Sequence, residues 1–274
     1  MKIAVIGAGA WGTVFGGVLR HRGHDVEILG RERDDGAVED AELVVVAVPS
    51  RSFGEVVKEL PGDSPVLSLT KGLDPATGGR LTALVENRPV AVLSGPNIAA
   101  EIAEGLPTAA VVASEDHALA VGLQHEINSM TFRVYVNDDP EGVEFAAAAK
   151  NVIALAAGAM DGLALGSNAK AALITLGLAD MATLGTAIGA QRETFAGLAG
   201  TGDLLTTCWS RHSRNRRAGA LMARGASAAD ALRKIGTVEG LTTAPILDDR
   251  AQEMGIDLPI TRAVREVLDG RQIR

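Results

Sequence analysis

The segment from Met1 to Leu29 constrains the fold most, because two short apolar runs flank a glycine-rich turn. Lys2–Ile6 is a continuous apolar run, as expected for a strand that is buried on both faces. It leads into Gly7-Ala8-Gly9-Ala10-Trp11-Gly12, which matches GxGxxG, then into a helix to about Arg22 and a strand at Asp25–Leu29. This order predicts a dinucleotide site, because glycines permit the tight turn and the helix N-terminus favours a pyrophosphate.

The end of the second strand bears on cofactor preference. NAD enzymes usually carry an acid there, but this chain has Gly30-Arg31-Glu32-Arg33. Arginine suits a 2′-phosphate, so NADPH/NADP is favoured and NAD remains possible. The alternative is that Arg31 and Arg33 are ordinary surface charges.

Five more apolar runs continue the strand pattern up to residue 137, with helical segments between most of them. They are Leu43–Val48, Val66–Thr70, Val90–Ser94 and residues 108–113 and 132–136. Only residues 30–42 join the second strand to the third, near the minimum of about 10–12 residues for a parallel crossover. The pattern predicts an N-terminal Rossmann-like domain over residues 1–137, an α/β fold with a doubly wound, mostly parallel sheet.

Helical periodicity replaces the strand pattern after residue 137 and holds to the end of the chain. Breaks are expected near Gly158–Gly166, Gly197–Gly202 and Gly236–Gly240. We therefore predict an all-helical C-terminal domain over residues 138–274.

One charge interrupts the apolar stretch Glu144–Gly158, which is long enough for about four helical turns. Lys150 sits in its middle, and its neighbours on a helix face are alanines and Ile153, none of which can pair with an ammonium. Burying an unpaired charge is costly, so a partner from outside this helix is expected. The alternative is a lysine that reaches water from a helix end.

Other polar clusters offer candidate partners, and each has a plainer alternative. Lys71 follows a strand at the sheet edge where ligands gather. Asp203 ends the turn Gly200-Thr201-Gly202, and could be only a turn residue. Arg214 lies in the first turn of a helix that Ser213 can cap, which suits phosphate, but it could belong to a solvated basic face. Glu239 precedes another helix and could be a plain cap.

Bulk properties exclude several classes of function. The formal net charge of −8 disfavours a general nucleic-acid role. A single cysteine, Cys208, allows no internal disulfide and favours a reducing compartment, so we expect a cytoplasmic protein. Neither a signal peptide nor an uncharged apolar run of about 18 residues is present, so no membrane span is expected. The five histidines show no ligand spacing, and we predict no metal.

Seven segments together resemble bacterial-type glycerol-3-phosphate dehydrogenase, collinearly over nearly the whole chain. They are GAGAWGT, VAVPS, LTKGLDP, SGPNIAAEIAEGLPTA, KNVIALAAGAMDGLALGSNAKAALITLGL, TFAGLAGTGDLLTTCWSRHSRNRRAG and TVEGLTTA. The resemblance implies reversible hydride transfer between NAD(P)H and dihydroxyacetone phosphate, which gives sn-glycerol 3-phosphate for phospholipid synthesis.

The resemblance also implies roles for residues that match the family motifs. Lys150 would be the catalytic lysine, Asp203 would pair with it, and Lys71 would hold substrate oxygens. The implied substrate-binding set is Lys71, Gly95, Asn97, Lys150, Asn151, Asp203, Thr207, Ser213, Arg214 and Asn215. The implied cofactor-binding set is Gly7, Gly9, Ala10, Trp11, Gly12, Arg31, Lys71, Ala99, Arg214 and Glu239.

Three departures from the family pattern stand out. Some tens of residues between the second strand and VAVPS are missing, Asn97 stands where Ser is frequent, and Leu176 stands where Arg is frequent. Two other functions stay open: a related dehydrogenase for another hydroxy acid, and a cofactor-binding protein without turnover. We expect a small-molecule substrate and a homodimer.

Overall fold

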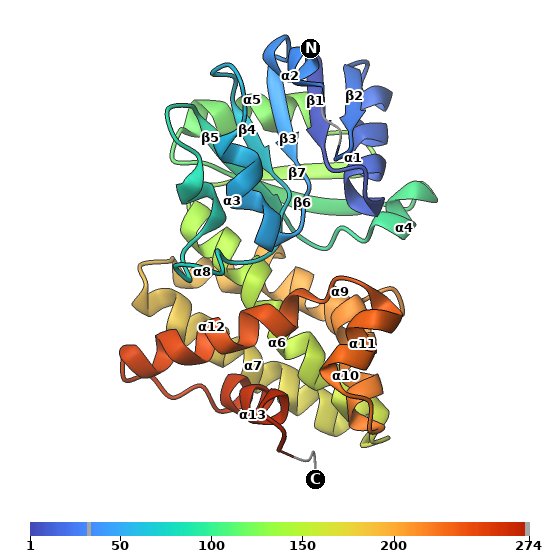
Figure 1. Cartoon of the computed structure of the whole chain (residues 1–274), viewed down its shortest axis with the longest axis vertical. Helices are drawn as coiled ribbons and strands as arrows, with labels where there is room; N and C mark the ends of the chain where they lie inside the picture. The colour runs from blue at the N-terminus through green and yellow to red at the C-terminus, as the bar shows by residue number, and fades with distance from the viewer. Residues whose placement is uncertain (32–33, 272–274) are drawn as a thin grey trace.

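A seven-stranded sheet forms the N-terminal half of the computed structural model, which describes residues 1–31 and 34–271 (Figure 1). The strands are β1 Lys2–Ile6, β2 Asp25–Leu29, β3 Leu43–Val46, β4 Val66–Ser68, β5 Val90–Ser94, β6 Thr108–Ala113 and β7 Phe132–Asn137. Their order is β2-β1-β3-β4-β5-β6-β7, and every neighbouring pair is parallel except β5 and β6. The predicted, mostly parallel sheet is confirmed.

Helices cover both faces of this sheet. They are α1 Ala10–His21, α2 Asp35–Glu39, α3 Ser50–Lys58, the 3-10 helix η1 Leu81–Leu84, α4 Ala99–Ala103 and α5 His117–Ile127. Ile3 and Val5 of β1 pack in the cluster that contains α1 and α5, whereas Ala4 and Ile6 pack in the cluster that contains α2 and α3. Alternate side chains of one strand thus meet opposite layers, which explains why these strands are apolar throughout.

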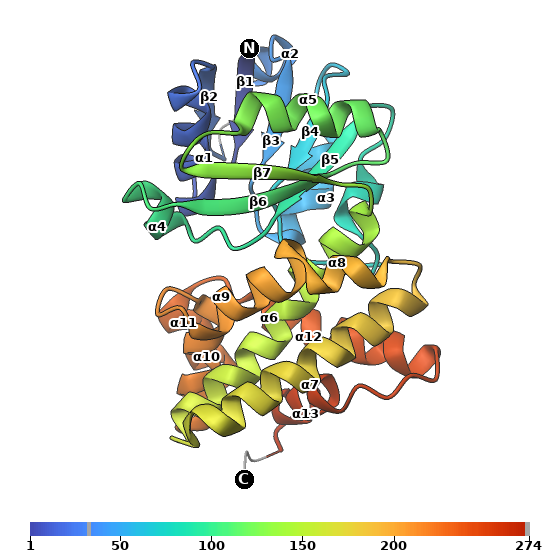
Figure 2. The same cartoon turned by 180° about the vertical axis from the view of Figure 1, so that it is seen from behind.

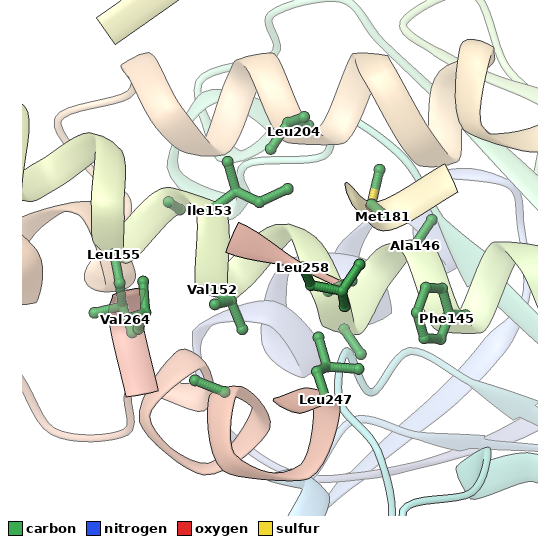
Figure 3. Packing of buried hydrophobic residues seen from close by; sticks show 14 of the residues in the cluster. Phe145, Ala146, Val152, Ile153, Leu155, Met181, Leu204, Leu247, Leu258 and Val264 are labelled. Atoms are coloured by element: carbon green, nitrogen blue, oxygen red, sulfur yellow. The ribbon is translucent and has the colours of Figure 1, made fainter. Parts of the chain in front are cut away.

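The C-terminal half is helical, as predicted. Its helices are α6 Pro140–Gly162, α7 Gly166–Ala187, α8 Arg192–Ala196, the π-helical turn η2 Leu198–Gly202, α9 Asp203–Trp209, α10 Arg214–Ala223, α11 Ala228–Ile235, α12 Glu239–Glu253 and α13 Pro259–Leu268. Both views show α6 descending from the sheet through the middle of the other helices (Figures 1 and 2). Side chains of α6 such as Phe145, Val152 and Leu155 share one core with Leu204, Leu247 and Val264 of surrounding helices (Figure 3).

Helix α6 is long and apolar enough to cross a membrane by length and composition alone. However, 89% of its most apolar window is buried inside the protein, as expected for the core helix of a folded domain. Its alanines let the neighbouring helices approach closely.

The break expected near Gly158–Gly166 is confirmed, and it lies in the second half of that range. Helix α6 continues through Gly158 to Gly162, and the chain turns only at residues 163–165. The glycine at 158 serves close packing instead, because a Cβ atom there would lie 1.9 Å from the carbonyl oxygen of Arg216.

A buried carboxylate joins α6 to the sheet domain. Glu144 is fully buried and accepts hydrogen bonds from the backbone nitrogen of Thr82 at 3.0 Å and from its Oγ1 at 2.5 Å. Burial raises the pKa of Glu144 to about 7, although the bonds from Thr82 oppose the shift. Sequence analysis did not identify this connection.

Glu144→Gln is expected to remove a pH-dependent part of the stability. The contribution of Glu144 to the free energy of unfolding is largest below pH 4.5, the ordinary pKa of a glutamate. It falls as the pH rises to about 7, because the carboxyl group binds its proton more tightly in the folded protein than in the unfolded chain. The neutral variant should therefore gain up to roughly 3 kcal/mol of unfolding free energy relative to wild type over that window. Denaturant unfolding at several pH values measures this difference.

Glu141→Gln is the matched control, because Glu141 lies one turn earlier on α6 with its side chain 34% exposed. The difference in unfolding free energy between Glu141→Gln and wild type should change less with pH than the difference between Glu144→Gln and wild type. Parallel stability curves for wild type and Glu144→Gln would contradict the role given to Glu144.

Candidate active site

The ammonium group of Lys150 is buried on α6 and paired from outside that helix. Its Nζ donates to Asp203 Oδ1 at 2.7 Å and to Thr207 Oγ1 at 2.8 Å, and its side chain is 5% exposed. The interpretation of a lysine that reaches water is therefore wrong, and the expected external partner is Asp203. Two of three N–H bonds are used within the described residues, which leaves one donor for a ligand.

Asp203 is the first residue of α9 and directly follows the π-helical turn η2. Its two oxygens are divided between two lysines, with Oδ1 bonded to Lys150 and Oδ2 bonded to Lys71 at 2.8 Å. Burial alone would raise the pKa of Asp203, but the two ammonium groups outweigh it and lower the pKa. The carboxylate thus stays charged, and Asp203 is more than a turn residue.

Lys71 lies beyond the end of β4 and links Asp203 to the loop after β5. Its Nζ donates to Asp203, to Asn97 Oδ1 at 2.6 Å and to the Gly95 carbonyl at 3.0 Å. Burial lowers the pKa of Lys71 to about 8, with Lys150 acting in the same direction and Asp203 opposing. All three N–H bonds are used, so a ligand oxygen would have to replace one acceptor.

The loop after β5 places one further donor beside these lysines. Gly95 has φ +131°, and a Cβ atom there would lie 3.0 Å from Ala109 O, so the loop requires glycine. Asn97 is 7% exposed, and its Nδ2 is buried without a hydrogen-bond partner among the described residues. A buried unpaired amide is costly, which marks this group as a candidate ligand donor.

Two asparagines connect α6 to α10. Asn215 Nδ2 donates to Asn151 Oδ1 at 2.8 Å, and Asn151 Nδ2 donates to the carbonyl of Lys71 at 3.3 Å. Asn215 Oδ1 in turn accepts from the backbone nitrogen of Gly240 at 2.9 Å. The predicted residues Asn151 and Asn215 are therefore brought together, but mainly bond each other and the backbone.

Helix α10 begins as predicted, with Ser213 as its cap. Ser213 Oγ accepts from the backbone nitrogen of Arg216 at 3.2 Å. Arg214 is exposed and makes no ion pair with a described residue, whereas Arg216 pairs with Asp161. The helix N-terminus and the unpaired guanidinium can together receive a phosphate.

The glycine turn after β1 forms a cradle for a pyrophosphate. Gly7 has φ +118°, and a Cβ atom there would lie 2.4 Å from Ala47 O, whereas the space beside Gly9 is open. No side chain caps the N-terminus of α1 at Ala10, and Trp11 Nε1 is buried without a partner among the described residues. Gly12 must also stay small, because its Cβ would lie 2.0 Å from Gly7 O. These residues fit the dinucleotide that the sequence predicts.

The other predicted cofactor residues lie around this cradle or on the helical domain. Ala99 begins α4, which packs against α1. Arg31 is exposed just after β2, and the expectation for Arg33 falls outside the described residues. Glu239 is not a simple cap: its carboxylate accepts from Ser50 Oγ at 2.6 Å and from Ser50 N at 3.3 Å, across the two domains.

Sequence analysis missed Ser50 and Ser94 in this region. Ser50 follows Pro49 near the carboxyl end of β3, the same signal that pointed to Lys71, so it could have been found. Ser94 ends β5 at the same sheet edge, and its Oγ lies 3.4 Å from Asp203 Oδ2, a partner 109 residues away that no local pattern indicates.

Two features of the described residues concern what a metal site or a nucleophilic cysteine would require. No cluster of three or more potential metal ligands occurs among them. Cys208 is fully buried, and burial raises the pKa of its thiol to about 12, which leaves it unreactive.

Comparison with known proteins gives a consistent result over nearly the whole chain. Family models described as the N- and C-terminus of NAD-dependent glycerol-3-phosphate dehydrogenase match residues 33–120 and 139–273, and a model of ketopantoate reductase PanE/ApbA matches residues 3–61. The glycerol-3-phosphate dehydrogenase (NAD(P)+) of Synechococcus sp. (strain JA-2-3B'a(2-13)) is 43% identical, with 98% of this chain and 90% of the relative covered. That of Thermus thermophilus is 41% identical, with 97% and 93% covered.

Solved structures agree with the sequence relatives. The crystal structure of glycerol-3-phosphate dehydrogenase from Coxiella burnetii has a TM-score of 0.92 and 36% identity, with 97% of this chain and 94% of that chain covered. A PanE/ApbA ketopantoate reductase from Ralstonia eutropha is 19% identical with a TM-score of 0.62 and shares the fold alone.

The lowered pKa of Lys71 can be measured directly by NMR. With carbon-13 label in the six lysines, one ε-methylene signal should titrate near pH 8 rather than 10.5, because burial disfavours the charged form. Asp203→Asn should lower that midpoint further, since the opposing carboxylate charge is removed.

Lys71→Arg provides the assignment, because it should delete that signal and leave the other lysine signals in place. If no lysine signal titrates well below the ordinary value of 10.5, the lowered pKa is refuted.

Proposed function

The chain belongs to the NAD-dependent glycerol-3-phosphate dehydrogenase family, and we propose that it interconverts dihydroxyacetone phosphate and sn-glycerol 3-phosphate. The observation that carries this proposal is the buried Lys150: Asp203 and Thr207 accept two of its N–H bonds, and no residue in the described part of the chain accepts the third. The product would supply phospholipid synthesis.

Lys150 acts in this proposal as the proton donor to the ketone oxygen. The nicotinamide cofactor, when bound, supplies or accepts the hydride at the carbonyl carbon. Lys150 gives a proton to the oxygen in reduction and takes it back from the hydroxyl in oxidation. Thr207 Oγ1 donates to the carbonyl of Asp203 at 2.6 Å, so its lone pairs face the lysine and help to orient it.

Asp203 and Lys71 keep the charges balanced during this transfer. When Lys150 loses its proton, the carboxylate of Asp203 stays paired with Lys71 at 2.8 Å and does not become an isolated buried charge. Lys71 therefore supports the reaction through Asp203, and it can reach substrate oxygens by releasing Gly95 or Asn97. The unpaired Nδ2 of Asn97 can donate to a substrate hydroxyl.

The phosphate of the substrate is assigned to the start of α10. Arg214 supplies a guanidinium with no competing partner among the described residues, and Ser213 and the backbone of the first turn add neutral donors. The bond between Asn151 and Asn215 keeps this end beside the lysine, because each asparagine directly follows Lys150 or Arg214.

The cofactor is NAD(P), and we propose a preference for NADPH. Arg31 supports this preference, since it is exposed at the end of β2 where the 2′-phosphate would lie. Glu239, Ala99, Lys71 and Arg214 complete the proposed cofactor contacts, and the domain boundary is placed between residues 137 and 138.

A homodimer in the cytoplasm is also part of the proposal. Light scattering should give twice the chain mass of 28.2 kDa.

A steady-state assay with dihydroxyacetone phosphate, run in parallel with NADH and NADPH, tests the function and the preference together. Turnover with both cofactors and a lower KM for NADPH is expected. Turnover of another keto compound, with none of dihydroxyacetone phosphate, would favour a related hydroxy-acid dehydrogenase. Cofactor binding with no turnover of any keto compound would favour a protein without catalysis.

Lys150→Ala should lower kcat by at least roughly 100-fold, because the general acid is lost. Binding of NADPH, followed by its fluorescence, should stay near wild type, since the glycine cradle is untouched. Lys234→Ala, at an exposed position on α11, is the control and should retain full activity. A wild-type rate in Lys150→Ala would remove Lys150 from its assigned role.

Arg214→Ala should raise KM for dihydroxyacetone phosphate by roughly 10- to 100-fold, the cost of losing a charge-assisted bond. Arg217→Ala, an exposed arginine on the same helix, should leave KM nearly unchanged. Equal effects of the two substitutions would argue against a phosphate site at Arg214.

A further inference from the structure

Helices α6 and α10 pack backbone against backbone through three glycines, Gly158, Gly162 and Gly219, which we call the glycine seam. A Cβ atom on Gly158 would lie 1.9 Å from Arg216 O, and one on Gly219 would lie 1.9 Å from Leu155 O. On Gly162 it would lie 2.7 Å from Ala220 O. Carbonyl oxygens of a neighbouring helix cannot move aside as a flexible side chain can, so any side chain here must separate the helices.

The seam joins the two helices that carry the two ends of the proposed substrate site. Helix α6 carries Lys150 two turns before Gly158, and α10 carries Arg214 two residues before Arg216, which Gly158 contacts. Above the seam, the asparagine pair joins the same two helices at 2.8 Å.

A salt bridge also holds α10 against α6. Asp161 of α6 pairs with Arg216 of α10 at 2.5 Å and with Lys170 of α7 at 2.9 Å. Lys170 is itself buried, with its ammonium 5.1 Å from the ring centre of Trp209. The backbone contacts, the amide pair and the salt bridge together hold α10 against α6.

We propose that the glycine seam sets the separation between Lys150 and Arg214, and thereby selects the length of phosphorylated ketone that the site accepts. Gly158 and Gly219 are positioning residues in this inference, which rests on the proposed function. A methyl group on either would push α10 away by about 1–1.5 Å, the movement needed to turn its clash with the carbonyl oxygen into an ordinary contact. A displacement of about 1 Å is enough to cost on the order of 100-fold in a site that must hold two ends of one substrate.

A change in the distance between Lys150 and Arg214 can be distinguished from general damage to the site. Compounds that bind at only one end of the site should not be affected by that distance. Gly219→Ala should lower kcat/KM for dihydroxyacetone phosphate by roughly 10- to 100-fold. The rate constant with dihydroxyacetone, which lacks the phosphate, should stay near wild type. The inhibition constant of inorganic phosphate, which needs only the α10 end, should also stay near wild type.

Gly122→Ala is the matched control, since Gly122 lies within α5 and has no atom within 4 Å of an added Cβ. It should change none of the three constants. Circular dichroism and thermal unfolding establish that each variant is folded before kinetics are compared.

Asp161→Asn keeps the test decisive if Gly219→Ala does not fold. It removes the charge that holds Arg216 without adding bulk, so it should raise KM for dihydroxyacetone phosphate by roughly 3- to 10-fold. Again dihydroxyacetone and inorganic phosphate should be unaffected.

Two results would overturn the inference. One is a folded variant in which kcat/KM for dihydroxyacetone phosphate and the rate constant with dihydroxyacetone both fall while the inhibition constant of inorganic phosphate rises, which would indicate general damage. The other is an unchanged kcat/KM for dihydroxyacetone phosphate. Failure of the proposed function is distinguishable from both, because wild type itself would then not turn over dihydroxyacetone phosphate.

Discussion

A single buried carboxylate, shared by two ammonium groups, organises the site. Asp203 is 2% exposed, and it could not remain charged there without Lys150 and Lys71. The three residues come from α9, from α6 and from the loop after β4, so their pairing also ties the helical domain to the sheet. Loss of the shared charge would leave two cations facing each other in an apolar setting. The close packing of small residues around Lys150 is what makes this geometry possible.

Much of this arrangement could be predicted from the sequence because its signals are local. The order of strand, glycine turn and helix identified the cofactor half, and all seven predicted strands are present within two residues of their expected ends. Lys150 was identifiable because it is the one charge in the apolar run 145–158, which obliges the fold to provide a partner. Choosing Asp203 as that partner required the family resemblance, since several acids were available.

The remaining contacts could not be predicted because they join surfaces that are far apart in the chain. Thr82 and Glu144 are 62 residues apart, and Ser50 and Glu239 are 189 apart. Nothing beside Glu144 in the sequence distinguishes it from a half-buried glutamate such as Glu141 on the same helix. The exact end of α6 within Gly158–Gly166 could not be predicted for a related reason: glycine marks either a helix end or a close helix contact, and only the position of α10 decides between them.

The unbroken helix α6 limits how far the two domains can move relative to each other. The helix starts against the sheet, where Val143 and Glu144 pack, and runs without interruption to Gly162 in the helical domain. A wide hinge opening between the domains would have to bend this helix or break the bonds of Glu144 and Glu239, so only small rotations are inexpensive. Lys150, halfway along the same rod, is thus in place before any ligand arrives. The two halves of the molecule are therefore expected to stay nearly fixed while ligands enter and leave.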